Sequence, residues 1–243
     1  MALAAISGHQ GGPEHRMPVT HESYRAAVES GAEYVELDVR RTRDGVLVVH
    51  HDADCGRPGA AVADLYYAEL CGCLGRTVPR VADVMEILAG KVAAHLDLKE
   101  TGYEAEVIGP ALDAFGPDGF VVTTLEDVSI ARISREFPSV RTALSLGRDL
   151  GGLPPYRRTA ARLSEIFPVR RLQACGAQWA ALNYRLVLAG VLSRCAANGI
   201  GTMLWTVDRD ELITRYLKDP RVDVVITNHP ERARALRDSL ADA

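Results

Sequence analysis

The chain has 243 residues, a formal net charge of −4 and a hydrophobic fraction of 47%. This length fits one large α/β domain or two small ones, and the hydrophobic fraction is enough for a sizeable core. The acidic balance argues against a nucleic-acid-binding surface as the main activity.

The five cysteines show no metal-finger spacing; they are Cys55, Cys71, Cys73, Cys175 and Cys195. Their odd number, without a secretory context, predicts free thiols in a reducing compartment, packed as small hydrophobic side chains. The N-terminal segment lacks the basic and apolar regions of a signal peptide, and no apolar run is long enough to span a membrane. We therefore expect a cytoplasmic protein without stable membrane insertion.

Strand and helix patterns alternate along the chain. Short apolar runs predict strands at 3–7, 34–39, 46–49, 92–99, 119–125, 140–146, 177–183, 200–207 and 222–227. Amphipathic segments predict helices at 20–31, 80–88, 103–115, 127–137, 157–167, 186–198, 210–217 and 230–240. Residues 53–79 are expected to be irregular, with a short helix at 63–70.

Eight of these strands are each followed by a helix. The ninth, at 46–49, belongs to a hairpin inserted after the second strand; we call this hairpin and the irregular residues 53–79 the excursion. This order predicts one (β/α)8 TIM-barrel domain over residues 1–243. A doubly wound open sheet is the alternative, but the order of the motifs described below favours the barrel.

The second strand carries two carboxylates on one face. Because side chains alternate along a strand, Glu36 and Asp38 point one way and their apolar neighbours the other. Burying both is costly unless something positive lies between them. A turn at Asp44-Gly45 then returns the chain to His51. A strand with one solvated face is the simpler interpretation, but the histidines and a further carboxylate strand favour a metal site.

Polar candidates recur at the carboxyl ends of the predicted strands, where barrel active sites lie. They are His9, Glu36, Asp38, His51, Asp97, Lys99, Trp205 and Asn228. Three carboxylates without a cysteine suit Mg²⁺ or Ca²⁺ better than zinc. Two histidines beside such an ion could act as general acid and base around a phosphate, and a lysine could neutralise the remaining charge.

The motif order resembles the glycerophosphodiester phosphodiesterase family. It runs H-x-G at His9, G-A-E-Y-V-E-L-D-V-R-R-T-R-D-G-V-L-V-V-H-H-D from Gly31, then L-D-L-K, L-W-T-V-D and V-D-V-V-I-T-N-H-P. The resemblance implies a TIM barrel with a catalytic histidine pair, His9 and His51, and an active-site lysine, Lys99. It also implies one divalent cation, Mg²⁺ or Ca²⁺, held by Glu36, Asp38 and Asp97.

The implied reaction is metal-assisted attack on a small phosphodiester, with one histidine deprotonating the nucleophile and the other protonating the leaving oxygen. In the family the nucleophile is often the substrate's own adjacent hydroxyl, which gives a cyclic phosphate that water can open. The sequence does not assign the acid and base roles to the two histidines.

Three positions depart from the family pattern. Gln10 replaces the arginine of H-R-G, and residues 17–20 lack the glutamate of P-E-N-T. Asp97 replaces a glutamate, which also resembles the related sphingomyelinase D and phospholipase D toxins that cyclise their substrates. The head group and the choice between hydrolysis and cyclisation therefore stay open.

We expect a phosphodiesterase whose substrate-binding residues are Gln10, Lys99 and Trp205. The alternatives are a lyase that releases a cyclic phosphate, and a barrel that binds a phosphorylated ligand without turnover. Trp205 and Asn228 fit either the core or the pocket, and His50 is expected to be structural. The remaining histidines are expected at the surface or in packing; they are His15, His21, His95 and His229. The sequence does not predict an oligomeric state.

Overall fold

A computed structural model describes residues 3–11, 19–152 and 154–241. His15 and residues 17–18 of the departing 17–20 segment lie outside this described part, so the expectations for them are not addressed by the fold.

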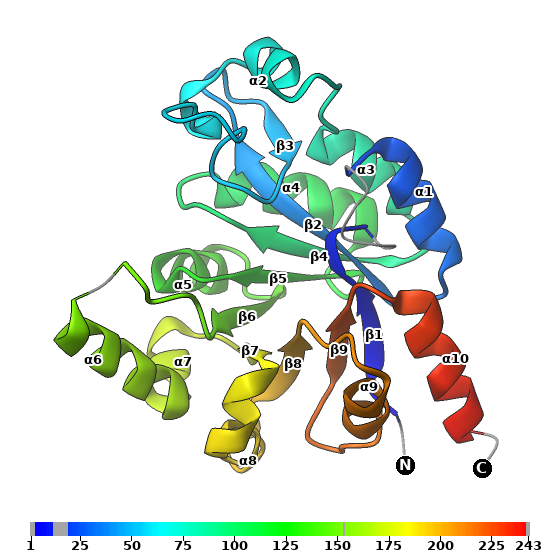
Figure 1. Ribbon diagram of the computed structural model, residues 1–243, viewed down its shortest axis with the longest axis vertical. Coiled ribbons are helices and arrows are strands. Elements are labelled where there is room, and N and C mark those ends of the chain that lie inside the picture. The colour runs from blue at the N-terminus through cyan, green and yellow to red at the C-terminus, as the bar shows by residue number, and fades with distance from the viewer. Residues whose placement is uncertain (1–2, 12–18, 153, 242–243) are drawn as a thin grey trace.

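Within the described residues, eight parallel strands close into a barrel (Figure 1). They are β1 (Ala5–Gly8), β2 (Tyr34–Arg41), β4 (Ala93–Leu98), β5 (Phe120–Thr124), β6 (Arg141–Leu146), β7 (Trp179–Asn183), β8 (Gly201–Trp205) and β9 (Val224–Thr227). Strand β1 pairs with both β2 and β9, which closes the sheet. The TIM-barrel prediction is confirmed, and the doubly wound open sheet is wrong.

The hairpin excursion and the helices surround this barrel. Strand β3 (Leu47–Val49) pairs antiparallel with β2, as the turn at Asp44-Gly45 predicts. The α-helices are α1 (His21–Glu29), α2 (Tyr67–Leu74), α3 (Val81–Leu88), α4 (Glu104–Phe115), α5 (Asp127–Glu136), α6 (Pro155–Ile166), α7 (Val169–Cys175), α8 (Val191–Ala196), α9 (Asp210–Leu217) and α10 (Pro230–Ala241). Short 3-10 helices are η1 (His9–Gly11), η2 (Val62–Asp64) and η3 (Tyr184–Ala189).

The core has an inner and an outer part. Apolar side chains fill one part of the barrel interior, including Val121, Met203 and Ile226. Larger apolar clusters occupy the space between the strands and the helices. Strand β5 is buried along its whole length, as expected for a parallel strand covered on both faces. The carboxylates inside the barrel therefore stand out, and they gather on β2 and β4.

Three elements differ from the sequence predictions. The helix predicted at 186–198 is η3 followed by α8, because Gly190 between them adopts a left-handed φ of 76°. Helix α7 was not predicted. The single short helix expected at 63–70 is instead η2 followed by α2.

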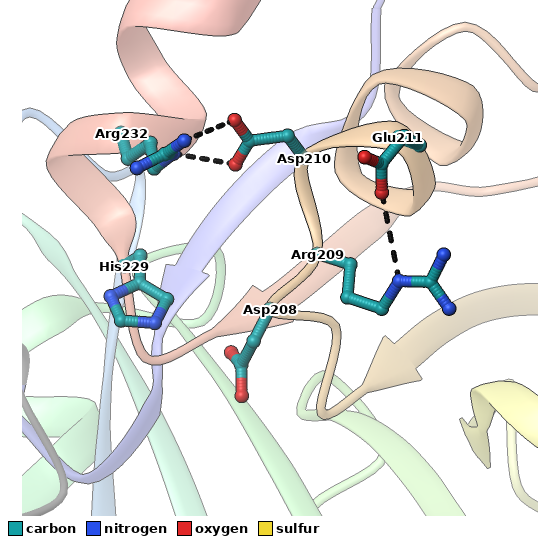
Figure 2. Close-up of a pocket in the computed structure, with 6 residues that line it drawn as sticks. All are labelled: Asp208, Arg209, Asp210, Glu211, His229 and Arg232. Atoms are coloured by element: carbon teal, nitrogen blue, oxygen red, sulfur yellow. Dashed lines mark hydrogen bonds and ion pairs between the residues drawn. The ribbon is translucent and has the colours of Figure 1, made fainter.

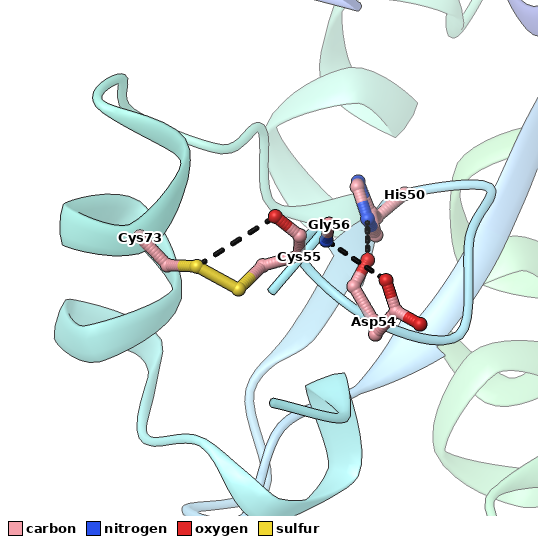
Figure 3. The surroundings of a disulfide bond; sticks show 5 residues. All are labelled: His50, Asp54, Cys55, Gly56 and Cys73. Carbon is pink, nitrogen blue, oxygen red and sulfur yellow. Dashed lines mark hydrogen bonds between the residues drawn. A yellow bond between two sulfur atoms is a disulfide. The ribbon is translucent and has the colours of Figure 1, made fainter. Parts of the chain in front are cut away.

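The prediction of five free thiols is wrong. Cys55 and Cys73, separated by 18 positions in sequence, form a disulfide with Cα atoms 6.2 Å apart (Figure 3). The excursion folds back on itself, so α2 brings Cys73 over the loop that follows His51. Both cysteines belong to a small apolar cluster with Val62 and Leu70. The other three cysteines are free thiols.

In the described part of the chain, no helix has both the length and the apolar character needed to cross a membrane.

Candidate active site

Three carboxylates converge inside the barrel on two neighbouring strands. Glu36 and Asp38 project from the same face of β2, and Asp38 is in register with Asp97 of β4. One carboxylate oxygen of each lies within 4.8 Å of the others. Glu36 and Asp38 are buried and Asp97 is nearly so. The alternation that the sequence predicted therefore produces a compact acidic cluster rather than a solvated face.

Lys99 supplies the positive charge next to this cluster. Its Nζ lies 2.5 Å from Asp97 Oδ2 and 2.8 Å from Asp38 Oδ1. Burial alone would lower the pKa of Lys99, but Asp97, Asp38 and Glu36 together raise it well above its usual value. Burial opposes ionisation of Asp97 as well, yet Lys99 and a hydrogen bond from Thr123 hold its pKa below the usual value. Lys99 is therefore a permanent cation at this site.

One lysine does not balance three carboxylates. Burial, with repulsion from Asp38 and Asp97, raises the pKa of Glu36 well above its usual range. Asp38 Oδ1 is buried and, among the described residues, lacks a well-directed hydrogen bond despite its ion pair with Lys99. An under-satisfied buried oxygen and clustered hard oxygen donors fit a divalent cation of the Mg²⁺ or Ca²⁺ type. The cluster could hold such an ion.

His9 lies directly after β1 and beside the acidic cluster. The chain turns tightly here: a Cβ on Gly11 would come within 2.7 Å of the Tyr24 ring, and Gly11 has a φ of 76°. The Tyr24 hydroxyl in turn donates to the Glu36 carbonyl oxygen. His9 Nε2 lies 3.8 Å from Glu36 Oε2. The backbone N–H of Gln10 also donates to Glu36 Oε2, at 3.4 Å.

The other nitrogen of His9 is held by a relay from the last strand. His9 Nδ1 lies 2.7 Å from Asn228 Oδ1, and Asn228 Nδ2 donates to Asp208 Oδ2 at 2.7 Å. Because the amide nitrogen donates to the carboxylate, the amide oxygen must be the acceptor from His9. Nδ1 therefore carries a proton, and in the neutral ring Nε2 is the unprotonated nitrogen beside the acidic cluster. The sequence is compatible with Asn228 in either the core or the pocket. In the structure the Asn228 side chain contacts His9.

A surface pocket of about 430 Å³ borders Asp208, the carboxylate at the end of this relay (Figure 2). Asp208 and His229 line it, but its other charges form pairs with each other: Asp210 with Arg232, and Glu211 with Arg209. With Asp208 the lining holds three carboxylates and two arginines, so it offers no excess positive charge to a phosphate. We therefore take the barrel mouth, and not this larger pocket, as the candidate active site.

His51 reaches the barrel mouth at the end of the hairpin excursion. Arg40 of β2 is buried and donates to the His51 carbonyl oxygen from Nε at 3.1 Å and from Nη2 at 2.8 Å. Asp52 Oδ1 lies 2.8 Å from His51 Nδ1, and this hydrogen bond lowers the pKa of Asp52. His50 turns away and bonds the Asp54 carbonyl oxygen, at 3.0 Å. That His51 is a site residue and His50 a structural one stays a prediction.

A buried chain of hydrogen bonds supports the acidic cluster from below. The Thr123 hydroxyl donates to Asp97 Oδ1 at 2.6 Å, so its oxygen accepts from His95 Nε2 at 2.9 Å. His95 Nδ1 must then accept from the Ser7 hydroxyl, at 3.1 Å. Burial lowers the pKa of His95 to about 4, consistent with a neutral ring. The sequence placed His95 in packing or at the surface, and nothing in its local pattern signals that it orients a carboxylate.

These groups border one pocket of about 280 Å³ at the barrel mouth. Of the predicted residues, it brings together His9, Glu36, His51, Asp97, Lys99 and Trp205. Asp38 lies beneath them, and Trp205 Nε1 donates to the Ala181 carbonyl oxygen, which fixes the indole as part of the wall. Gln10 is outside the lining given by the described residues and contacts Glu36 through its backbone. The wall away from the carboxylates is largely apolar: Leu125, Ala181, Trp205 and Ile226.

The chain matches known proteins over most of its length. The sequence model of the glycerophosphoryl diester phosphodiesterase family matches residues 9–136, more than half of the chain. A glycerophosphodiester phosphodiesterase of Caldanaerobacter subterraneus subsp. tengcongensis is 24% identical, over 93% of this chain and 94% of that protein.

Solved structures show the same fold. A glycerophosphodiester phosphodiesterase from Parabacteroides distasonis superposes with a TM-score of 0.77 at 20% identity, covering 99% of each chain. An Oleispira antarctica phosphodiesterase in complex with the product sn-glycerol-3-phosphate gives a TM-score of 0.72 at 17% identity, covering 97% of each chain. The barrel, its clustered motifs and the family match lead to one conclusion: the chain belongs to the glycerophosphoryl diester phosphodiesterase family, a family of phosphoric diester hydrolases.

Proposed function

We propose that this protein is a divalent-cation-dependent phosphodiesterase that cleaves a small glycerophosphodiester to a phosphomonoester and an alcohol. The observation that carries the proposal is the meeting of two histidines, a lysine and an acidic cluster at one pocket. Its volume of about 280 Å³ suits a small diester. The sn-glycerol-3-phosphate bound by the Oleispira antarctica neighbour is a product of the expected kind.

Glu36, Asp38 and Asp97 are the residues that would hold the cation. When bound, Mg²⁺ or Ca²⁺ supplies a Lewis acid that polarises a phosphoryl oxygen and orients the attacking hydroxyl. Lys99 adds a fixed positive charge where negative charge develops on the phosphoryl oxygens. Trp205 forms the wall against which the alcohol portion packs. Gln10, which is outside the pocket lining given by the described residues, brings no charge where the family has an arginine.

The hydrogen bonds around the histidines favour distinct roles. Asn228 holds the Nδ1 proton of His9, so the lone pair of Nε2 can accept a proton from the nucleophilic hydroxyl. His51 is backed by the carboxylate of Asp52, which stabilises an imidazolium able to protonate the leaving oxygen. His9 is thus the base and His51 the acid.

A cyclic-phosphate lyase is the second candidate. The apolar wall of Leu125, Ala181, Trp205 and Ile226 favours it, because a lipid-like alcohol would pack there. Phosphorus NMR separates the two, since a phosphomonoester and a cyclic phosphate have different shifts. Glycerophosphodiesters should be turned over with Mg²⁺ or Ca²⁺ and not with EDTA. Tight ligand binding with no turnover of any diester would instead support a binding barrel.

The cytoplasmic location expected from the sequence stays a prediction. The Cys55–Cys73 disulfide weighs against it, because structural disulfides are rare in reducing compartments. Alkylating the free thiols of the protein inside intact cells and then counting the unmodified cysteines would decide whether the disulfide forms there.

A further inference from the structure

Large exposed hydrophobic side chains gather on one part of the surface. Among the described residues, four of the six that are both large and exposed lie between residues 156 and 188. They are Tyr156 (70% exposed), Leu163 (51%), Phe167 (58%) and Leu188 (89%). Single exposed apolar residues are ordinary, but a group of them marks a contact surface.

Three of the four form a stripe along α6. Tyr156, Ala160, Leu163 and Phe167 are spaced by four, three and four residues, which places them on one helical face, and all four are exposed. Helix α6 lies at the outer edge of the molecule and packs against η3, which carries Leu188 (Figure 1). We call Tyr156, Ala160, Leu163, Phe167 and Leu188 the α6 patch.

Helix α6 is inverted relative to an ordinary surface helix. Glu165, on the side opposite the stripe, is 1% exposed. Its Oε1 accepts from the Gly147 N–H at 2.9 Å, and its Oε2 pairs with Arg162 Nη1 at 2.6 Å. The helix therefore turns a fully bonded carboxylate inward and an apolar stripe outward. A sequence that needed only to cover the barrel would place these residues the other way round.

The sequence around the α6 patch is rich in arginine and poor in acidic residues, although Asp149, in the loop before α6, is exposed. Between Asp149 and Asp208 the sequence has a single acidic residue, the buried Glu165, in a chain whose net charge is −4. The same stretch holds seven arginines: Arg157, Arg158, Arg162, Arg170, Arg171, Arg185 and Arg194. Four of these are exposed and flank the patch on α6, α7 and η3, namely Arg157, Arg158, Arg170 and Arg185.

The α6 patch also lies near the barrel mouth. Strands β6 and β7 end at the mouth. Segment η3 follows β7 directly, and the eight residues 147–154 connect β6 to the first turn of α6. Arg148, in the loop before α6, donates to the carbonyl oxygen of Leu125, a pocket residue, at 2.8 Å. A surface that contacts the α6 patch would therefore lie beside the entrance to the site.

From these features we infer that the α6 patch docks the protein on an anionic lipid surface. An exposed apolar helix face flanked by arginines combines burial in the acyl boundary with attraction to phosphate head groups. Self-association through this patch is disfavoured, because a two-fold dimer would bring two positively charged faces together. The inference rests on the outer face of α6 and requires no step of the proposed chemistry.

The test is co-sedimentation of the full chain with vesicles of phosphatidylcholine, with and without phosphatidylglycerol. We expect partition onto the anionic vesicles, weak partition onto pure phosphatidylcholine, and loss of binding at about 1 M salt, where the Debye length is about 3 Å. Tyr156→Ser with Leu163→Ser should weaken partition by about tenfold or more. Arg157→Glu should weaken it by about fivefold or more.

Two controls accompany these variants. Tyr66→Ser removes an exposed tyrosine of the excursion, outside the patch, and should bind vesicles as the parent does. His9→Ala should also bind normally, so failure of docking and failure of the proposed chemistry can be told apart. The inference would be overturned if the parent protein did not bind anionic vesicles, or if Tyr66→Ser lost as much vesicle binding as the patch variants. A patch-dependent oligomer seen by light scattering, without vesicle binding, would overturn it too and identify a protein interface.

Discussion

Removing the charge of Glu36 should stabilise the metal-free protein while inactivating it. Glu36 is 6% exposed and shares a space with Asp38 and Asp97, where one lysine serves all three. Its raised pKa means that the unfolded chain gives up this proton more readily than the folded chain. The folded state is therefore penalised once the pH rises above about 4.3, the pKa of an unperturbed glutamate.

We expect Glu36→Gln, which keeps the side-chain shape, to increase the free energy of unfolding in EDTA by about 1–2 kcal/mol near neutral pH. For a chain of this size that corresponds to a Tm increase of about 2–8 °C. The gain should vanish below about pH 4, where the parent glutamate is protonated in both states. Phosphodiester turnover should fall by about 100-fold or more, because one member of the cation cluster is lost.

Thermal unfolding in EDTA across this pH range is the assay, and Glu106→Gln is the matched control. Glu106 pairs with Arg41 on the surface, with half of its side chain exposed, so its variant should shift the free energy of unfolding by less than about 0.5 kcal/mol. A lower Tm for Glu36→Gln in EDTA, or a gain that persists in acid, would refute the reasoning about buried repulsion.

Three further predictions follow from the hydrogen bonds and the disulfide. Because the pKa of His95 falls from 6.5 to about 4 on folding, its neutral ring contributes stability that is lost as the pH drops through that window. The loss is up to about 3 kcal/mol, and denaturant titrations of His95→Asn should show a shallower pH dependence there. Cys73→Ser should lower the free energy of unfolding by about 3 kcal/mol, whereas Cys71→Ser, at a free thiol, should cost less than about 1 kcal/mol in the same titration. Asn228→Ala should lower kcat by about 10–100-fold with little change in KM, since Asn228 orients His9 and does not line the pocket; an unchanged kcat would remove it from the mechanism.

The barrel could be predicted because each of its strands and helices has a recognisable pattern within a short stretch of the sequence. Each strand is a short apolar run followed by an amphipathic helix, and the alternation in β2 places Glu36 and Asp38 on one face whatever the surroundings. The meeting of His9, His51 and Lys99 with these carboxylates follows from the rule that barrel sites form at the carboxyl ends of strands.

What the sequence did not reveal depends on contacts between distant segments. Cys55 and Cys73 pair because the excursion folds back through α2, and no spacing rule encodes that path. His95 looks like a packing residue until Thr123 and Ser7, on two other strands, fix the direction of its hydrogen bonds. In the sequence, Glu165 has the pattern of a surface charge. In the structure it is bonded by Gly147 and Arg162 on the inner side of α6, which places the apolar stripe of α6 on the outer side.

The adjacent histidines of the hairpin give the most direct test of the central claim. The initial rate of glycerophosphodiester cleavage with Mg²⁺ or Ca²⁺ would be measured for His51→Ala and His50→Ala. We predict a loss of about 10²–10⁴-fold for His51→Ala, because the general acid is removed. His50→Ala should keep most of its activity, because the hydrogen bond that the described residues give His50 is to the Asp54 carbonyl oxygen and not to a group of the pocket. Equal activity of the two variants would contradict a mechanism based on His51 at the barrel mouth.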